Sequence, residues 1–171
     1  MKPLLSIQFL QELAWLAGVI DGEGCIGFTT TLTKKHQKAY QPAVRIGNTD
    51  FLMIEKASEI FKKYSKNGVD YGKVTRKSIG KDNSVRKNYY EIGLKRMEDL
   101  KDLLSDLVSF LTTKKKLALE FIQYCEHRLP NLRKGKHQRN YDEWELDFIK
   151  DHRPEIRNYN KVKAGTPAAK T

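Results

Sequence analysis

At 171 residues the chain is long enough for one domain with a buried core and too short for two well-built domains. Lys and Arg outnumber Asp and Glu by 32 to 21, so the formal net charge of +11 favours a polyanionic partner, either nucleic acid or an acidic membrane surface, while 39% hydrophobic residues indicate a folded chain. No apolar run approaches the roughly 20 residues that cross a bilayer, and polar residues interrupt the first segment where a signal peptide would be apolar. Cys25 and Cys125 lack the spacing of a disulfide framework or a zinc site. We therefore expect an intracellular protein in a reducing compartment.

The first half of the chain predicts a helix, a β-hairpin and a second helix. Apolar residues recur at helical spacing over residues 7–20. From Cys25 the pattern changes to alternation, which predicts a strand, and a second alternating run over 41–46 predicts the strand that pairs with it. Residues 48–50, Asn-Thr-Asp, are helix-capping types directly before the next helical pattern, so we expect a helix to begin there.

The second half of the chain repeats the order of two strands and a helix. Strand candidates at 71–78 and 86–95 flank a segment rich in turn residues. Apolar stripes then predict helices over 97–111 and 117–129, and Pro130 is expected to end the compact part.

The sequence predicts one domain over residues 1–130 and a basic extension over 131–171. The extension contains one short amphipathic helix around 144–149 and ends in a frayed tail over 157–171. Its first residues form a basic run, Arg133, Lys134, Lys136 and Arg139.

The segment Leu16–Gly24, LAGVIDGEG, ends the first helix with two carboxylates and three glycines. Gly18 lies on a small-residue face that would let another helix approach closely, and we expect Gly22 and Gly24 to adopt conformations closed to other residues. Glu23 projects from the negative end of the helix dipole, where a hard divalent cation would compensate its charge. On spacing alone, a glycine-rich helix end with solvated acids is the alternative.

This segment resembles the LAGLIDADG motif of homing endonucleases, from which it differs conservatively at three positions. The predicted order of elements over about residues 7–128 is also similar to the αββαββα domain of that family. The resemblance implies an α+β fold with an antiparallel DNA-binding sheet. It also implies a site-specific DNA endonuclease that hydrolyses one phosphodiester on each strand of a long, roughly palindromic target.

The resemblance implies how the motif would work. Because the chain has one copy, it must pair with itself through the motif helix, using Ala14, Ala17 and Gly18. In each subunit Glu23 and the backbone carbonyl of Gly22 would bind Mg²⁺, with Mn²⁺ substituting and Ca²⁺ supporting binding without cleavage. Asp21 matches an acid with a helix-capping and interface role. The family usually has Asp where Glu23 stands, so this chain has a longer carboxylate side chain at that position.

Two further catalytic positions are carried over by local match. Asn48 corresponds to a polar residue that orients water near the metal, and Lys114 to a basic residue near the scissile phosphate. The alternatives are that Asn48 or Asp50 caps the next helix and that Lys114 to Lys116 form a solvated first turn.

The main rivals are an RNA maturase and a non-catalytic DNA-binding regulator of the same fold. The positive charge suits both, whereas the acid at position 23 favours the nuclease. Histidines do not take part in the predicted site and are interpreted as ordinary polar or phosphate-facing residues, because they lack the spacing of HNH or HExxH sites: His36, His127, His137 and His152.

Alternation along the strands predicts two different faces of the sheet. The core side carries Ile26, Phe28, Val44, Ile46, Val74, Ile92 and Leu94. The opposite side carries donors and acceptors that suit base edges in the major groove of double-stranded DNA, namely Thr29, Thr31, Thr33, Gln41, Arg45, Lys73, Thr75, Lys77, Tyr89, Glu91 and Lys95. Lys116 is a further predicted DNA contact. A merely solvated face would leave the basic excess without a partner.

Overall fold

The computed structural model describes residues 6–32, 38–65, 75–78, 88–133 and 141–152. The order of elements is α1 (Ile7–Glu23), β1 (Gly24–Leu32), β2 (Lys38–Asn48), α2 (Phe51–Lys62), β3 (Thr75–Ser78), β4 (Asn88–Leu94), α3 (Met97–Leu107), α4 (Lys115–Arg133) and α5 (Glu143–Asp151). The predicted αββαββα order is confirmed, and the fold is α+β.

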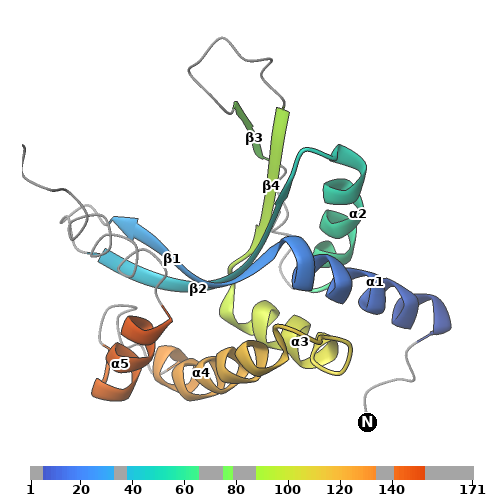
Figure 1. The fold of residues 1–171 in the computed structure, drawn as a ribbon. Coiled ribbons are helices and arrows are strands. Elements are labelled where there is room, and N and C mark those ends of the chain that lie inside the picture. Colours follow the sequence, from blue (N-terminus) through green and yellow to red (C-terminus); the bar gives the residue numbers. More distant parts are fainter. Residues whose placement is uncertain (1–5, 33–37, 66–74, 79–87, 134–140, 153–171) are drawn as a thin grey trace, which may run out of the picture.

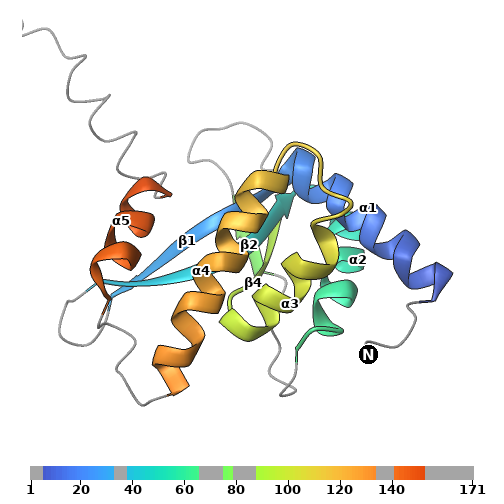
Figure 2. The ribbon, with the colours of Figure 1, turned by 90° about the horizontal axis from the view of Figure 1, so that it is seen from below.

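The strands form one antiparallel sheet in the order β1-β2-β4-β3. β1 and β2 pair over their length, from Gly24 opposite Ile46 to Leu32 opposite Lys38, and β4 lies between β2 and β3. The β1–β2 hairpin and the β3–β4 pair extend in different directions, and the face of the sheet between them carries none of the described helices (Figure 1). The view from below shows α3 and α4 in front of the strands (Figure 2).

Residue identity explains where the helices begin. The Ser6 hydroxyl accepts from Phe9 N at the start of α1, and Asp50 accepts from Leu52 N and Met53 N at the start of α2. These side chains satisfy backbone N–H groups that have no partner within the helix. The predicted cap of α2 is therefore confirmed for Asp50.

The core lies between the sheet and the helices and contains the apolar stripes of both. Of the residues predicted on the core side, Val74 lies outside the described residues and the others are all at most 5% exposed: Ile26, Phe28, Val44, Ile46, Ile92 and Leu94. The assignment of faces from alternation is confirmed. None of the helices in the described ranges is long and apolar enough to cross a membrane.

The prediction that Pro130 ends the compact part is wrong, because Pro130 lies inside α4, which continues to Arg133. Proline lacks the N–H that would bond to the carbonyl four residues back, but one lost bond near a helix end does not stop a helix held by packing. α5 joins the same core through Ile149, which is 4% exposed. The predicted boundary between residues 130 and 131 therefore falls within a helix.

The burial of two α4 residues was not predicted. Tyr124 and Arg128 are almost fully buried, because α5 packs over this side of α4. The helix predicted over 97–111 is shorter in the structure, because α3 ends at Leu107. Leu111 is nevertheless buried, since hydrogen bonds from Phe110 N and Leu111 N to Leu107 O continue the helical path as a turn.

Candidate functional site

The end of α1 and the start of α4 cap each other. The Asp21 carboxylate accepts four hydrogen bonds, from Thr112 N at 2.7 Å, Thr113 N at 3.3 Å, Thr113 Oγ1 at 2.9 Å and Lys114 N at 2.9 Å. In return, Lys114 Nζ donates to the carbonyls of Ile20 at 2.7 Å and Asp21 at 2.6 Å. A carboxylate thus meets the positive end of α4, and an ammonium meets the negative end of α1. Asp21 therefore caps the start of α4 in this structure.

Glu23 is the last residue of α1 and its side chain is exposed. Hydrogen bonds from Gly24 N and Lys114 Nζ go to the carbonyls of Val19, Ile20 and Asp21. None of these bonds goes to the carbonyl of Gly22. The helix end therefore presents a carboxylate and a neighbouring carbonyl oxygen, the two oxygen types that hard divalent cations prefer.

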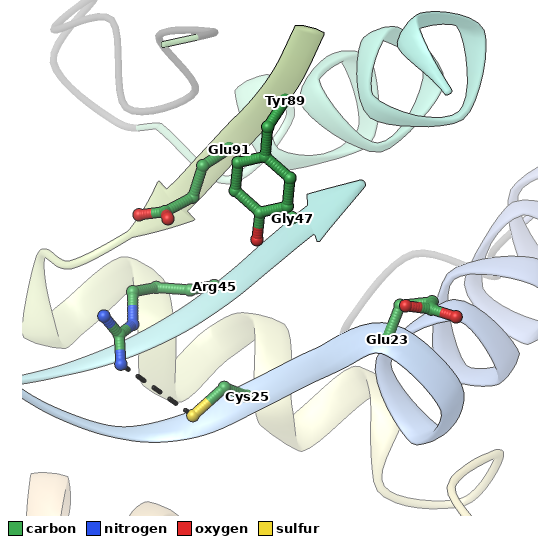
Figure 3. A pocket seen from close by; sticks show the side chains of 6 residues that line it. All are labelled: Glu23, Cys25, Arg45, Gly47, Tyr89 and Glu91. Atoms are coloured by element: carbon green, nitrogen blue, oxygen red, sulfur yellow. Dashed lines mark hydrogen bonds between the residues drawn. The ribbon is translucent and has the colours of Figure 1, made fainter. Parts of the chain in front are cut away.

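Glu23 borders an open depression of about 230 Å³ on the face of the sheet that carries no described helix. The other lining residues come from β1, β2 and β4: Cys25, Arg45, Gly47, Tyr89 and Glu91. The Glu23 carboxylate points away from Arg45, whose guanidinium turns toward Cys25 Sγ at 3.9 Å (Figure 3). Because sulfur is a weak acceptor, this contact leaves the Arg45 donors available to a stronger ligand.

Gly47 leaves the space that the end of the Tyr89 side chain occupies. A Cβ atom at position 47 would lie 1.8 Å from the Tyr89 hydroxyl oxygen, so any larger residue would displace the ring. Gly47 is directly opposite Glu91, and Lys77 is opposite Tyr89, which puts these positions on one face of the sheet. Tyr89 and Glu91 belong to the recognition face that alternation predicts, whereas the space at Gly47 was not predicted.

The expectation for the motif glycines needs correction. Gly22 is helical and Gly24 has a φ of −84°, so both conformations are open to other residues. Gly24 is required for space instead, since a Cβ there would lie 2.7 Å from Ile20 Cα. The close approach arises because the chain turns from the end of α1 directly into β1.

The comparisons with known proteins rest on structure. No protein-family model and no curated protein matches the sequence. The structure is similar to I-CeuI, a group I intron-encoded homing endonuclease complexed with DNA, with a TM-score of 0.57 and 13% identity over 84% of this chain and 67% of that one. For the homing endonuclease I-CvuI in complex with its target, the TM-score is 0.54 at 20% identity, over 75% and 73% of the two chains.

The third comparison carries the name of the motif. The I-SmaMI LAGLIDADG homing endonuclease bound to cleaved DNA matches 94% of this chain and 51% of that one, with a TM-score of 0.50 and 14% identity. The chain has the LAGLIDADG homing endonuclease fold. In this fold α1 carries the segment LAGVIDGEG, and the polar face of the sheet lies beside its end.

Outer residues of the LAGLIDADG helix α1 leave room for a neighbour. Ala14, Gly18 and Gly22 are exposed, and a Cβ at either glycine would meet nothing within 4 Å. Ala17, which was predicted to share this face, is fully buried in the core of its own chain. Residues 14 and 17 are three apart, but residue 17 is rotated toward the sheet, whereas 14, 18 and 22 form one stripe.

Two further predicted DNA contacts, Thr29 and Gln41, lie on the same sheet face. Thr29 pairs with Gln41 across β1 and β2, and their side chains bond to neighbouring backbone, Thr29 Oγ1 to Gln41 O and Gln41 Nε2 to Lys95 O. Lys116 lies apart, on α4, with a side chain 91% exposed. The backbones of Thr31, Thr75 and Lys77 are in strands. Thr33, Lys73 and the basic residues Lys134, Lys136 and Arg139 lie outside the described residues.

The two catalytic positions predicted by local match both have structural partners. Asn48 Oδ1 accepts from Asp50 N at 3.0 Å, so its oxygen supports the turn into α2. Lys114 is engaged with the end of α1, as described above. The alternative that Asn48 or Asp50 caps the next helix holds for Asp50, which is the cap of α2. The alternative that Lys114 to Lys116 form a solvated first turn does not hold for Lys114, which lies at the start of α4 and is half-buried.

The reciprocal cap predicts a pH-dependent stability. Burial raises the pKa of Asp21, but the hydrogen bonds from Thr112, Lys114 and Thr113 outweigh it and lower the pKa below 3.8. A lowered folded-state pKa stabilises the fold above the unfolded-state value, and that stability is lost as pH falls through the folded-state pKa. Asp21→Asn should therefore cost about 1–2 kcal/mol at neutral pH, because an amide nitrogen would face N–H donors, and the cost should shrink as pH falls through the folded-state pKa, because the wild-type carboxyl then becomes neutral as well.

Urea unfolding of both proteins between pH 2 and pH 7 measures this difference. The matched control is Asp50→Asn, because only Oδ1 of Asp50 accepts the bonds at the start of α2 and an amide oxygen can replace it. The control should cost clearly less. Equal costs for the two variants, or an Asp21→Asn cost independent of pH, would show that the reciprocal cap does not hold α1 to α4.

Proposed function

We propose that the chain is a site-specific DNA endonuclease that acts as a homodimer with divalent metal. The observation that carries the proposal is the position of Glu23, exposed at the end of α1 and bordering the depression on the polar sheet face. A nucleic-acid-binding surface needs no carboxylate at this point, because a negative charge repels phosphate. A metal-dependent nuclease does need one. The net charge of +11 supports a polyanionic substrate.

Glu23 and the Gly22 carbonyl would hold Mg²⁺ or Mn²⁺ in each subunit, whereas Ca²⁺ would support binding alone. The bound ion would polarise the scissile phosphate, stabilise the leaving 3′ oxygen and generate hydroxide from water. Asn48 keeps its amide N–H groups for a water molecule, because the bond to Asp50 N uses its oxygen. Lys114 would place positive charge next to the phosphate, from its position at the end of α1.

The proposed homodimer rests on the outer stripe of α1. Ala14, Gly18 and Gly22 allow two α1 helices to approach closely, and their pairing would put two Glu23 side chains side by side. The comparison with I-SmaMI supports this arrangement, since this chain matches 51% of that one. Both described cysteines are free, which suits action inside a cell or organelle.

A two-step selection tests the proposed function. Duplexes from a randomised pool are first retained on the protein in Ca²⁺ and then incubated with Mg²⁺. We expect the retained duplexes to share a target with two inverted half-sites and to be cut on both strands, and chelation to prevent the cut. If the protein retains duplexes but cuts them in neither Mg²⁺ nor Mn²⁺, the result would indicate a DNA-binding regulator. Retention of structured RNA without duplex DNA would indicate a maturase.

Arg45 should determine sequence preference within each half-site. Its guanidinium lies on the sheet face, where its hydrogen-bond partner among the described residues is the weak acceptor Cys25 Sγ, and Arg is well suited to read guanine edges. Arg45→Ala should weaken binding by about 1–3 kcal/mol for the preferred base at one position per half-site. Lys116→Ala is the control, because the exposed Lys116 ammonium would contact phosphate. Its removal should weaken binding to all sequences alike and reduce the dependence of binding on salt concentration. A uniform loss in Arg45→Ala across single-base variants would contradict the assigned face.

A further inference from the structure

A cluster of polar side chains joins α4 to the beginning of α5. His127 Nε2 on α4 lies 2.6 Å from Asp142 Oδ2. Asp142 caps α5, with Oδ1 accepting from Glu145 N at 2.9 Å, and Glu145 Oε2 accepts from Asp142 N at 2.9 Å and from Arg128 Nη1 at 2.7 Å. The ligand-type atoms of His127, Asp142 and Glu145 all lie within 4.8 Å of one another.

Glu145 has an unused oxygen in this cluster. Its side chain is only 1% exposed, and Oε1 is buried without a hydrogen-bond partner in the described part of the chain. A buried carboxylate oxygen without a partner is costly, so it is an unusual feature to keep without a ligand. Capping of α5 uses only Oε2 and leaves Oε1 unexplained.

The net charge of the cluster favours the binding of a cation. Two carboxylates, Asp142 and Glu145, face one permanent positive charge, on Arg128. With His127 neutral the group carries one net negative charge. A neutral imidazole is also the form that binds metal.

We propose that His127, Asp142 and Glu145 form a second metal site, which binds a divalent transition-metal ion such as Zn²⁺. One imidazole nitrogen and two carboxylate oxygens suit zinc, whereas Mg²⁺ prefers oxygen ligands alone. Tetrahedral bonds of about 2.0–2.1 Å place ligand atoms roughly 3.3 Å apart, so the ion would replace the hydrogen bond between His127 Nε2 and Asp142 Oδ2, now 2.6 Å apart, and move these two atoms away from each other. His127 and Asp142 can make this adjustment because their side chains are 42% and 45% exposed, while Glu145 is fixed by burial. The earlier interpretation of His127 as an ordinary polar residue would then be wrong.

The site would fasten α5 beneath the β1–β2 hairpin. α5 and the residue before its cap already contact this hairpin. The Tyr141 hydroxyl accepts a hydrogen bond from Tyr40 N at 2.9 Å and donates one to Tyr40 O at 3.1 Å. Phe148 packs on Phe28 with ring centroids 6.1 Å apart. In Figure 1, α5 lies beside one end of α4 and under the two strands. A bound metal ion would therefore stabilise the packing of α5 against the β1–β2 hairpin. This role does not depend on the proposed nuclease activity.

Metal titration of the full-length, metal-free protein tests the proposal. Saturating Zn²⁺ should raise Tm by about 5–10 °C, and Mg²⁺ at the same concentration should not. His127→Gln and Asp142→Asn should each weaken zinc affinity at least roughly tenfold, and Asp142→Asn keeps a good helix cap. Glu145 is left unchanged, because its loss would remove the ion-pair partner of the buried Arg128 side chain. The matched control is His152→Gln, which removes a histidine that also pairs with a carboxylate, that of Glu120.

Two results would overturn the second metal site. One is a wild-type protein that zinc neither binds nor stabilises. The other is a His127→Gln protein with wild-type zinc affinity, which would place the metal elsewhere. Glu23→Gln separates this test from the nuclease test, because that variant should keep the zinc shift in Tm and lose only cleavage.

Discussion

Replacing Glu23 by Gln should abolish DNA cleavage while DNA affinity stays the same or rises. The substitution removes a proposed metal ligand. The stabilisation that such a metal would give the transition state is several kcal/mol, equivalent to a rate loss of about 10³-fold or more. It also removes a negative charge from the path of the phosphates, which should favour binding. Folding should be unchanged because the side chain is exposed. Cleavage rates in Mg²⁺ and binding in Ca²⁺ measure the two effects separately.

Two variants make this result specific. Glu23→Asp keeps a carboxylate and should retain cleavage, because the family motif itself has Asp at this position. Glu59→Gln removes an exposed acid from α2 and should change neither cleavage nor binding. A Glu23→Gln protein that cuts its target at the wild-type rate would contradict the assignment of the metal site.

Gly18→Leu should convert the protein into an inactive monomer. A Cβ atom added at this position meets nothing within 4 Å in the described part of the chain, and leucine is a better helix former than glycine by roughly 1 kcal/mol. The folded monomer should therefore be at least as stable as before. Two α1 helices that approach closely could not accommodate two leucines at the contact, since overpacking costs about 1–3 kcal/mol or more. Sedimentation should show monomers, and cleavage should be lost.

The control for this variant is Lys62→Leu, which adds the same side chain to an exposed position at the end of α2. It should leave sedimentation and cleavage unchanged. Unaltered dimerisation in Gly18→Leu would mean that subunits pair through another surface. A wild-type protein that stays monomeric on its target would contradict the homodimer altogether.

Periodicity predicted the elements of the fold because it reports local geometry. Alternation in β1, β2 and β4 assigned both faces of the sheet, and Ile26 and Arg45 lie where it placed them. The motif at the end of α1 drew attention to Glu23. Each of these inferences uses residues that are close in sequence, for which spacing determines the direction of a side chain.

Contacts between distant segments could not be predicted in this way. Asp21 and Lys114 are separated by 93 residues, so their reciprocal cap follows only from the packing of α1 against α4. Arg128 is buried because Glu145 on α5 is its partner, whereas an isolated arginine is normally expected at the surface. The same packing carries α4 past Pro130 and brings His127 to Asp142.

Strand-resolved cleavage by a mixed dimer tests the central claim most directly, because each subunit is proposed to contribute one Glu23 and to cut one strand. Wild-type and Glu23→Gln subunits with different affinity tags are combined, the mixed dimer is purified, and both strands of the selected target are labelled. We predict that the wild-type dimer cuts both strands, the mixed dimer nicks one strand of each duplex, and the Glu23→Gln dimer cuts neither. A mixed dimer that cuts both strands at the wild-type rate would contradict the account.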